Sequence, residues 1–493
     1  MLSFTTTRKG FFTMATSIAA MLAGCAAQQE QTTGTESTSG SGESTASEST
    51  STSARETITD DTAGGHAIEV SGETAAYTSV DVVKTGDDAG NDEADFYGTN
   101  AAVYAEEGAT LGLDDVTVTT DGAHANAVFS YGEGTTINVS NSTIETSSNN
   151  SGAIMVTGGG TLVATDVTAH TTGNSSAPIR SDRGGGLQQV SGGTYTSDGV
   201  GSPVIYSTAD VQVSGAMLES TSSQGVVVEG KNSVSLNDCQ LVANNISKNS
   251  DKSDWYQAVM IYQSMSGDAA QGAAAFTAKG GSITNKNGDL FFVNNTVCTI
   301  GLEGTSITNE DTQGNFLRAA AAGWGREGSN GGQVTINASG QHVDGTMLVD
   351  EVSNLNLYLK GGSDFVGAIN PDAAAGEVYV ELEEGSTWEL TADSHIKALT
   401  CGTDAITLGG FTLTVGEEAY AEGTASTGEP IEVTVSESAG GPGEGGEPPE
   451  KPGEGGPGAP GGEMPGGEPP AKPDGDTGGE PPAKPGSTSS SSK

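Results

Sequence analysis

Three consecutive stretches of 26 residues decide the fold: 108–133 (GATLGLDDVTVTTDGAHANAVFSYGE), 134–159 (GTTINVSNSTIETSSNNSGAIMVTGG) and 160–185 (GTLVATDVTAHTTGNSSAPIRSDRGG). Each begins with a glycine, and Gly186 begins the next one. Six residues before these glycines lie Ala102, Val128, Ile154 and Arg180. Short β-type runs, such as Thr136-Ile137-Asn138-Val139, are separated by Gly, Asn, Ser and Asp. A fixed period of this length indicates a repeat architecture.

The period shortens further along the chain, where Ser191, Ser214 and Asn237 follow one another at intervals of 23 residues. A coil of 22–26 residues with about three short strands cannot close a core alone, but stacked coils bury one another's inward side chains. The pattern predicts an all-β, right-handed parallel β-helix over residues 63–430. Alternation places Val, Ile, Leu and Ala inward and Thr, Ser, Asn and Asp outward, with Gly at corners that need positive φ. A β-sandwich array is the alternative, although hairpin-linked strands rarely keep such a register.

The segments that flank this body have a different composition. Residues 25–62 are mostly Ser, Thr, Gly, Glu and Ala, which predicts a disordered linker. Residues 431–493 are rich in Pro, Gly and Glu, and Gly-Gly-Glu-Pro-Pro-x-Lys-Pro begins at Gly445, Gly466 and Gly478. Pro-Pro favours polyproline II and Gly-Gly interrupts it, so we expect a disordered spacer. A ligand for a proline-binding domain is the alternative.

Residues 1–24 have the features of a secretory signal peptide. Arg8 and Lys9 precede an apolar run that is too short to span a bilayer. The run ends in Leu22-Ala23-Gly24-Cys25, which resembles the lipobox of bacterial lipoproteins. The resemblance implies cleavage before Cys25 and a diacylglyceryl group on its sulfur, which would hold the protein at a membrane. An ordinary signal peptide with an incidental cysteine is the alternative.

The charge of the chain excludes one class of partner. Asp and Glu number 64 and Lys and Arg 19, which gives a net charge of −45 at pH 7. Such a chain repels nucleic acid. Cys239, Cys298 and Cys401 are far apart and odd in number, so we expect small buried apolar residues rather than disulfides. The scattered His and Cys residues make a zinc site an unlikely feature of this chain.

The body resembles a known superfamily. Runs such as 160–167 (GTLVATDV) and 230–239 (GKNSVSLNDC) are similar to the pectate-lyase-like β-helix superfamily. The runs 385–390 (GSTWEL) and 411–415 (FTLTV) are similar to the last coils of autotransporter-type adhesin passengers. The resemblance implies the fold but not the function, because the superfamily includes lyases, hydrolases, adhesins and inert stalks.

Two charged clusters are candidate sites. Arg180, Asp182 and Arg183 lie where the preceding period is apolar, which could create an anion-binding or acid–base site. A local salt bridge is the alternative. Before the first regular coil lie five closely spaced carboxylates, which suit calcium but could equally form a solvated acidic loop: Asp87, Asp88, Asp92, Glu93 and Asp95.

Two stretches interrupt the repeat, at residues 248–275 and 319–332. Long loops on a rigid scaffold often carry binding residues, and flat aromatic rings stack on sugar faces. Trp255, Tyr256, Trp324 and Arg326 are therefore candidate ligand contacts. In the alternative, these rings fold down and cap a coil. Trp388 lies in a regular strand pattern and is expected to be structural.

Together these features predict a non-enzymatic surface lipoprotein, adhesin-like or carbohydrate-binding, whose partner is an extracellular glycan or a host or cell-wall surface. A structural stalk without a specific ligand is the first alternative. A polysaccharide lyase or hydrolase acting on acidic glycans is the second, and it depends on fold analogy.

Overall fold

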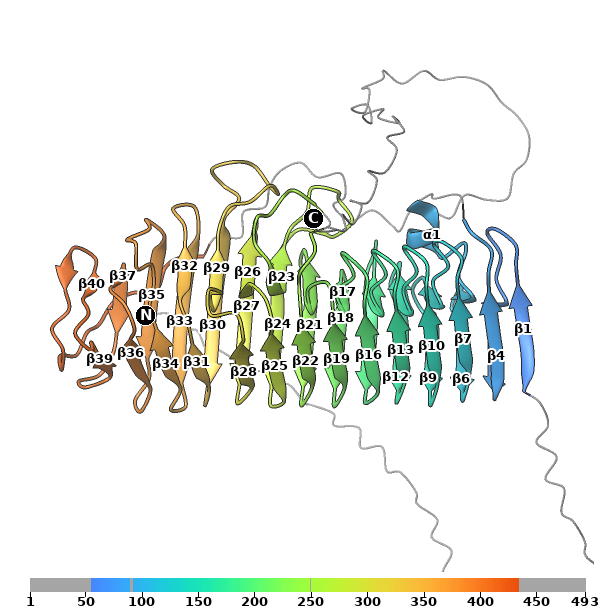
Figure 1. The fold of residues 1–493 in the computed structure, drawn as a ribbon, viewed down its shortest axis with the longest axis horizontal. Coiled ribbons are helices and arrows are strands. Elements are labelled where there is room, and N and C mark those ends of the chain that lie inside the picture. Colours follow the sequence, from blue (N-terminus) through green and yellow to red (C-terminus); the bar gives the residue numbers. More distant parts are fainter. Residues whose placement is uncertain (1–54, 89–91, 249, 434–493) are drawn as a thin grey trace, which may run out of the picture. The chain divides into compact units, whose positions relative to one another are not determined.

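The computed structural model describes residues 55–88, 92–248 and 250–433. The signal peptide, Cys25, most of the linker and most of the tail lie outside the described residues. Within them the predicted parallel β-helix is confirmed: every coil contributes a strand to sheet B, then to sheet C, then to sheet A (Figure 1). Strand pairing between coils is parallel throughout these three sheets, as in Val128↔Ile154 and Thr143↔Thr168.

Sheets A, B and C contain 10, 11 and 13 strands. The strands of sheet A are β1 (Glu56–Asp60), β4 (Val80–Lys84), β7 (Thr117–Thr120), β10 (Thr143–Thr146), β13 (Thr168–Thr171), β16 (Thr194–Ser197), β19 (Met217–Ser220), β22 (Gln240–Ala243), β25 (Ser282–Asn285) and β28 (Ser306–Asn309). The strands of sheet B are β2 (Ile68–Ser71), β5 (Val103–Glu106), β8 (Val128–Tyr131), β11 (Ile154–Thr157), β14 (Ile179–Ser181), β17 (Ile205–Ser207), β20 (Val226–Glu229), β23 (Gln257–Tyr262), β26 (Asp289–Asn294), β29 (Leu317–Ala319) and β32 (Met347–Val349). The strands of sheet C are β3 (Thr74–Thr78), β6 (Thr110–Asp114), β9 (Thr136–Ser140), β12 (Gly160–Thr165), β15 (Gly186–Ser191), β18 (Asp210–Ser214), β21 (Ser233–Asn237), β24 (Ala273–Lys279), β27 (Thr296–Glu303), β30 (Gly332–Ser339), β33 (Asn354–Lys360), β35 (Glu377–Leu382) and β38 (Ala398–Thr400).

Two small sheets complete the C-terminal coils. Sheet D contains β31 (His342–Asp344), β34 (Asp364–Gly367), β36 (Thr387–Leu390) and β39 (Ile406–Thr407). Sheet E contains β37 (Ser394–Ile396), β40 (Leu413–Val415) and β41 (Glu418–Ala419), and β41 pairs with β40 in antiparallel fashion.

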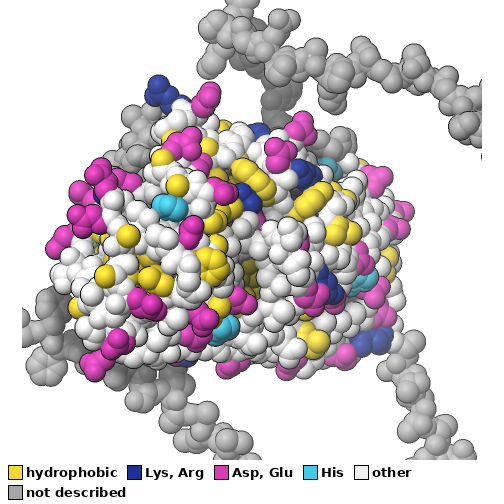
Figure 2. Space-filling view, turned by 60° about the vertical axis from the view of Figure 1, so that its left-hand side comes forward, with side chains coloured by type: hydrophobic (Ala, Val, Ile, Leu, Met, Phe, Trp, Pro, Cys, Tyr) yellow, Lys and Arg dark blue, Asp and Glu magenta, His cyan; other side chains and the backbone are white. Residues whose placement is uncertain are grey.

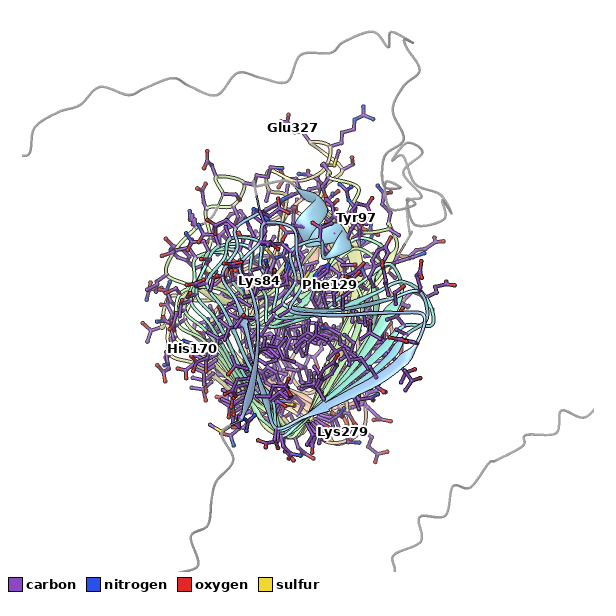
Figure 3. All side chains as sticks on the ribbon, turned by 90° about the vertical axis from the view of Figure 1, so that its right-hand side faces the viewer. Lys84, Tyr97, Phe129, His170, Lys279 and Glu327 are labelled. Carbon is purple, nitrogen blue, oxygen red and sulfur yellow. The ribbon has the colours of Figure 1, made fainter. Side chains whose placement is uncertain are left out.

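The core fills the interior of the coils, as the alternation predicts. Viewed along the stack in Figure 3, the centre is packed with carbon-rich side chains. One cluster of buried aliphatic residues continues from Ile68 to Leu413. The three cysteines in the described residues are free and buried, and Trp388 is 1% exposed. The predictions for these four residues are therefore confirmed.

The corner between sheets C and A explains the Gly, Asn and Asp punctuation. In successive coils the corner residue has a positive φ, as at Asp115 (53°), Asn141 (48°), Asp166 (51°) and Gly192 (65°). Left-handed backbone is least costly for Gly, Asn and Asp. The next residue can need glycine outright, because a Cβ on Gly193 would lie 2.2 Å from the carbonyl oxygen of Val167.

The register differs in detail from the 26-residue period. Thr110 pairs with Thr136, but Thr136 pairs with Thr161, an offset of 25 residues. In sheet B, Arg180 pairs with Met155 rather than with Ile154. The 23-residue offset is confirmed, since Ser191 pairs with Ser214 and Ser214 with Asn237.

Two local features differ from the sequence-based expectation. Strand β1 begins seven residues before the predicted start of the body at residue 63, and Arg55 beside it forms an ion pair with Asp81. The acidic stretch contains a short helix, α1 (Asp92–Tyr97), rather than only loop. No helix in the described part of the chain is long and apolar enough to cross a bilayer.

Candidate binding groove on the outer face of sheet B

The outer face of sheet B is not the polar wall that alternation predicts. Strands β5, β11, β20 and β26 are buried on both sides. Their outward side chains form one continuous row across the coils: Tyr104, Phe129, Met155, Arg180, Tyr206, Val227, Met260, Phe292 and Arg318. The expectation of outward Thr, Ser, Asn and Asp was wrong for this sheet, because loops and α1 cover its outer face. Figure 3 shows α1 and the loop with Glu327 rising on the side where Phe129 lies.

One part of this covered face is open as a groove of about 280 Å³. Its floor comes from β17, β20 and β23, and one wall comes from the loop 244–256 before β23. Trp324, from the loop 320–331 before β30, lies on the other side. We call this cavity the sheet B groove. Its main lining side chains are Tyr206, Gln224, Asn245, Lys248, Lys252, Trp255, Tyr256, Gln257, Met260, Tyr262 and Trp324.

The aromatic rings of the groove are fixed by contacts beneath them. The Trp255 ring centroid lies 5.5 Å from that of Phe292, and the Arg318 guanidinium carbon lies 4.5 Å from the Trp255 ring. Arg318 is itself held by an ion pair of 2.6 Å with Asp289. Both Trp255 and Trp324 remain partly exposed, so they neither project freely nor cap a coil completely.

Buried amides hold the loop that presents Trp324. Asn330 Nδ2 donates to the carbonyl oxygens of Ala322 (2.7 Å) and Trp324 (2.9 Å). Asn294 Nδ2 donates to the carbonyl oxygen of Ala320 at 2.9 Å. The two sides of the groove also meet, because Gly323 N–H donates to the Lys252 carbonyl oxygen at 2.7 Å. The groove is therefore formed in advance, which reduces the entropy that a ligand loses on binding.

A buried carboxylate holds two tyrosines of the groove. Glu229, 1% exposed, accepts hydrogen bonds through Oε2 from Tyr206 Oη (2.5 Å) and Tyr262 Oη (2.8 Å). Burial raises the pKa of both phenols well above the usual value, and the nearby carboxylate of Glu229 adds to the effect. Tyr262 in turn lies against Trp324, with ring centroids 5.1 Å apart.

The groove is cationic in an acidic protein. Lys248 and Lys252 line it, with Nζ atoms 5.5 Å from the Tyr256 ring and 5.9 Å from the Trp324 ring. No Asp or Glu is among the residues that line it. By contrast, acidic side chains are spread over the whole face seen in Figure 2, and basic ones are few.

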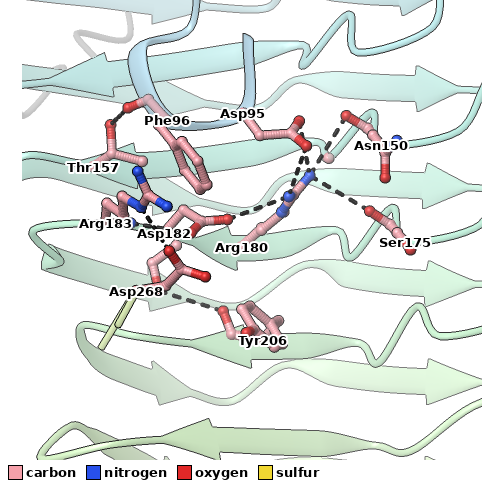
Figure 4. Close-up of polar contacts among 12 residues, drawn as sticks. Asp95, Phe96, Asn150, Thr157, Ser175, Arg180, Asp182, Arg183, Tyr206 and Asp268 are labelled. Carbon is pink, nitrogen blue, oxygen red and sulfur yellow. Dashed lines mark hydrogen bonds and ion pairs between the residues drawn. The ribbon is translucent and has the colours of Figure 1, made fainter. Parts of the chain in front are cut away.

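Arg180 and Asp182, predicted as a possible acid–base site, are buried next to the groove (Figure 4). Arg180 forms ion pairs with Asp95 of α1 (3.4 Å) and with Asp182 (3.3 Å). It also donates to the carbonyl oxygens of Asn150 and Ser175, both at 3.4 Å. The guanidinium thus joins α1 to the coils, and this geometry favours the salt-bridge alternative.

Arg183 has a different role from Arg180. Its Nε forms an ion pair of 2.5 Å with Asp268 in the loop 263–272, and its guanidinium carbon lies 3.8 Å from the Phe96 ring of α1. Arg326, the remaining basic candidate, is exposed and is not among the residues that line the groove.

The predicted calcium cluster is dispersed where it is described. Asp95 contacts Arg180 and His124, whereas Asp87 accepts a hydrogen bond from Ala123 N–H and Asp88 one from the Thr99 hydroxyl. The side chains of Asp92 and Glu93 are outside the described set. Among those that are described, no three His, Cys, Asp or Glu converge as a metal site requires. Calcium binding stays a prediction.

The carboxyls of the buried cluster have opposite pKa shifts. Burial raises the pKa of Asp182 to about 7, and the charge of Arg180 offsets only part of this effect. Burial also acts on Asp95, but the charge of Arg180 and the hydrogen bond with His124 outweigh it, so the pKa of Asp95 is lowered. The hydrogen bond with Asp95 raises the pKa of His124.

Asp182→Asn is expected to stabilise the protein at pH 8 and to change little at pH 4. The folded protein holds a proton on Asp182 up to about pH 7, whereas the unfolded chain releases it near its ordinary pKa of about 4. Wild-type stability should therefore fall between pH 4 and 7 relative to the variant, by about 1–3 kcal/mol, and the difference should stay constant above pH 7. Urea unfolding at several pH values measures this difference. A difference that does not depend on pH would show that Asp182 ionises normally.

Sequence reasoning identified Trp255, Tyr256 and Trp324 but missed the other groove residues. Tyr206, Glu229 and Tyr262 lie in ordinary β-type runs, and Lys248 and Lys252 lie in a polar loop. The available signal was the unbroken apolar runs, such as 154–156 and 290–293, because strands covered on both faces lose the alternation. No family model, curated protein or solved structure matches the chain. The resemblance to the pectate-lyase-like superfamily therefore stays a prediction beyond the fold itself.

Proposed function

We propose that the protein is a cell-surface lipoprotein that binds carbohydrate in the sheet B groove. The observation that carries the proposal is the groove itself: partly exposed Trp255, Tyr256 and Trp324 rings, side-chain amides, and two lysines without a carboxylate. Aromatic faces pack on the apolar faces of sugar rings, and amides and hydroxyls bond to sugar hydroxyls. Lysines would favour glycans that carry carboxylate or sulfate groups.

The anchor belongs to the same proposal and rests on sequence alone. Leu22-Ala23-Gly24-Cys25 supplies the lipidation motif, and residues 26–62 supply a tether of about 35 Å root-mean-square length. The groove volume of about 280 Å³ lies near the lower limit for ligand sites, so it accommodates a short segment of a glycan.

Trp324→Ala is expected to weaken binding of the best array glycan by about 10- to 100-fold, because aromatic side chains at binding centres commonly contribute about 2 kcal/mol or more. Trp324→Phe keeps a ring against Tyr262 and should lose much less. Arg326→Ala, in the same loop but outside the lining, is the matched control and should change the affinity less than twofold. The measurement is a glycan array with and without calcium, followed by titration, with circular dichroism to check the fold.

Two outcomes contradict carbohydrate binding in the groove. In the first, the wild-type protein retains no glycan of a broad panel in either calcium condition. In the second, Trp324→Ala binds as tightly as wild type. Release of unsaturated uronides or reducing ends by the purified protein would instead support the lyase or hydrolase alternative.

A further inference from the structure

We propose that the Gly-Gly-Glu-Pro-Pro-x-Lys-Pro repeats of residues 445–485 dock into the sheet B groove of their own chain. The groove is then occupied from within when no external ligand is present. This proposal does not depend on carbohydrate binding, because it concerns a peptide occupant.

The shape and chemistry of the groove suit a proline-rich peptide. Grooves that bind polyproline II segments are lined by aromatic rings, against which proline rings pack. Trp255, Tyr256, Tyr262 and Trp324 line this one from different loops and strands. Each repeat contains a Pro-Pro pair, which favours the extended conformation before binding and so lowers the entropic cost.

The charges are also complementary. Each repeat has a glutamate immediately before its Pro-Pro pair, at Glu447, Glu468 and Glu480. Lys248 and Lys252 are the charged residues of the groove lining, and each lies above an aromatic ring of that lining. A Pro-Pro pair on the rings would place the preceding carboxylate within reach of a lysine.

The last described residues run towards the groove. Gly428 N–H donates to Thr400 Oγ1 of β38 at 3.0 Å, and Ile431 exchanges two hydrogen bonds of 2.9 Å with the side chain of Asn356 of β33. Sheet C has the order β24-β27-β30-β33-β35-β38, so the chain passes from the C-terminal coils back towards those that bear the groove.

The distance is short for the length of chain that remains. From β33 to β24 there are three coil spacings, about 15 Å. Residues 432–444 separate Ile431 from the first repeat, and a flexible chain of that length spans about 20 Å. Such a linker gives an effective concentration on the order of millimolar, so even a weak repeat would occupy the groove for much of the time.

The experiment compares full-length wild-type protein with a full-length variant in which the three Pro-Pro pairs are replaced by serine. Its substitutions are Pro448→Ser, Pro449→Ser, Pro469→Ser, Pro470→Ser, Pro481→Ser and Pro482→Ser. The probe is a fluorescent synthetic peptide, Gly-Gly-Glu-Pro-Pro-Ala-Lys-Pro, followed by anisotropy. We expect the variant to bind the peptide two- to fivefold more tightly than wild type, because its own repeats no longer compete.

Matched controls separate the groove from the tail. A second full-length variant replaces the prolines outside the repeats (Pro442, Pro457, Pro460 and Pro465) with serine and should behave as wild type. In the six-proline variant, Lys248→Ala with Lys252→Ala should weaken the peptide at least fivefold, and Trp324→Ala should do the same.

Three results would overturn the proposal. The six-proline variant does not bind millimolar peptide, or it binds no better than wild type. Alternatively, the difference between the two proteins grows with protein concentration, which would mean that repeats dock between chains. Glycan retention in the same preparations shows separately whether the carbohydrate proposal stands.

Discussion

Arg180→Ala is expected to lower the free energy of unfolding by about 3–5 kcal/mol. Removing one partner of a buried ion pair leaves the other charge without compensation. Here two carboxylates are left, Asp95 and Asp182, and the carbonyl oxygens of Asn150 and Ser175 lose a donor. The loss should be largest above pH 7, where Asp182 is ionised in the folded protein.

Arg183→Ala is the matched control for Arg180→Ala. Arg183 is three residues away and also forms an ion pair, but its side chain is 42% exposed. Exposed pairs contribute about 0–1 kcal/mol, so this variant should stay within that range. Stacked coils can unfold in sections, so hydrogen exchange of β11, β14 and β17 should accompany urea unfolding. Equal losses for the two variants would contradict the buried role of Arg180.

Phe292→Ala should cost about 3–5 kcal/mol, as much as Phe291→Ala, although the two side chains point to opposite faces of β26. Phe291 points inward and packs near Phe276 and Phe316, at centroid distances of 5.7 and 5.6 Å. Phe292 points outward but is 0% exposed beneath Trp255, so its truncation also leaves a cavity.

Phe411→Ala is the control for both phenylalanines, because Phe411 is 40% exposed and its truncation should cost less than about 1 kcal/mol. Urea midpoints give the comparison. Phe292→Ala should in addition weaken binding in the groove, since it removes the support of Trp255. If Phe292→Ala costs no more than Phe411→Ala, the outer face of sheet B is not covered as described.

The fold could be predicted because its determinants are local and repeat. Inward residues such as Ile137 and Val139 alternate with polar ones, and the corner residues Asn141 and Asp166 tolerate positive φ. These patterns recur in every coil, so each supports the others. The register was less certain: turns absorb one residue more or less, and the chain therefore pairs Thr136 with Thr161 rather than keeping a strict period of 26.

The candidate site could be predicted only in part. Trp255, Tyr256 and Trp324 stood out because they interrupt the repeat, and the structure brings them together in one groove. Arg180 was detected as an anomaly, but its partner Asp95 lies 85 residues earlier in the sequence. Nothing in the local pattern pairs two residues so far apart.

The sequence by itself determined the coil: which side chains point inward, where the corners lie, and that the strands stack in parallel. Only the tertiary structure decided what covers the outside. Alternation specifies the direction of a side chain, whereas its burial depends on loops from other coils that fold over it. On sheet B such loops enclose Phe292, Glu229 and Arg180, and leave the groove open between them.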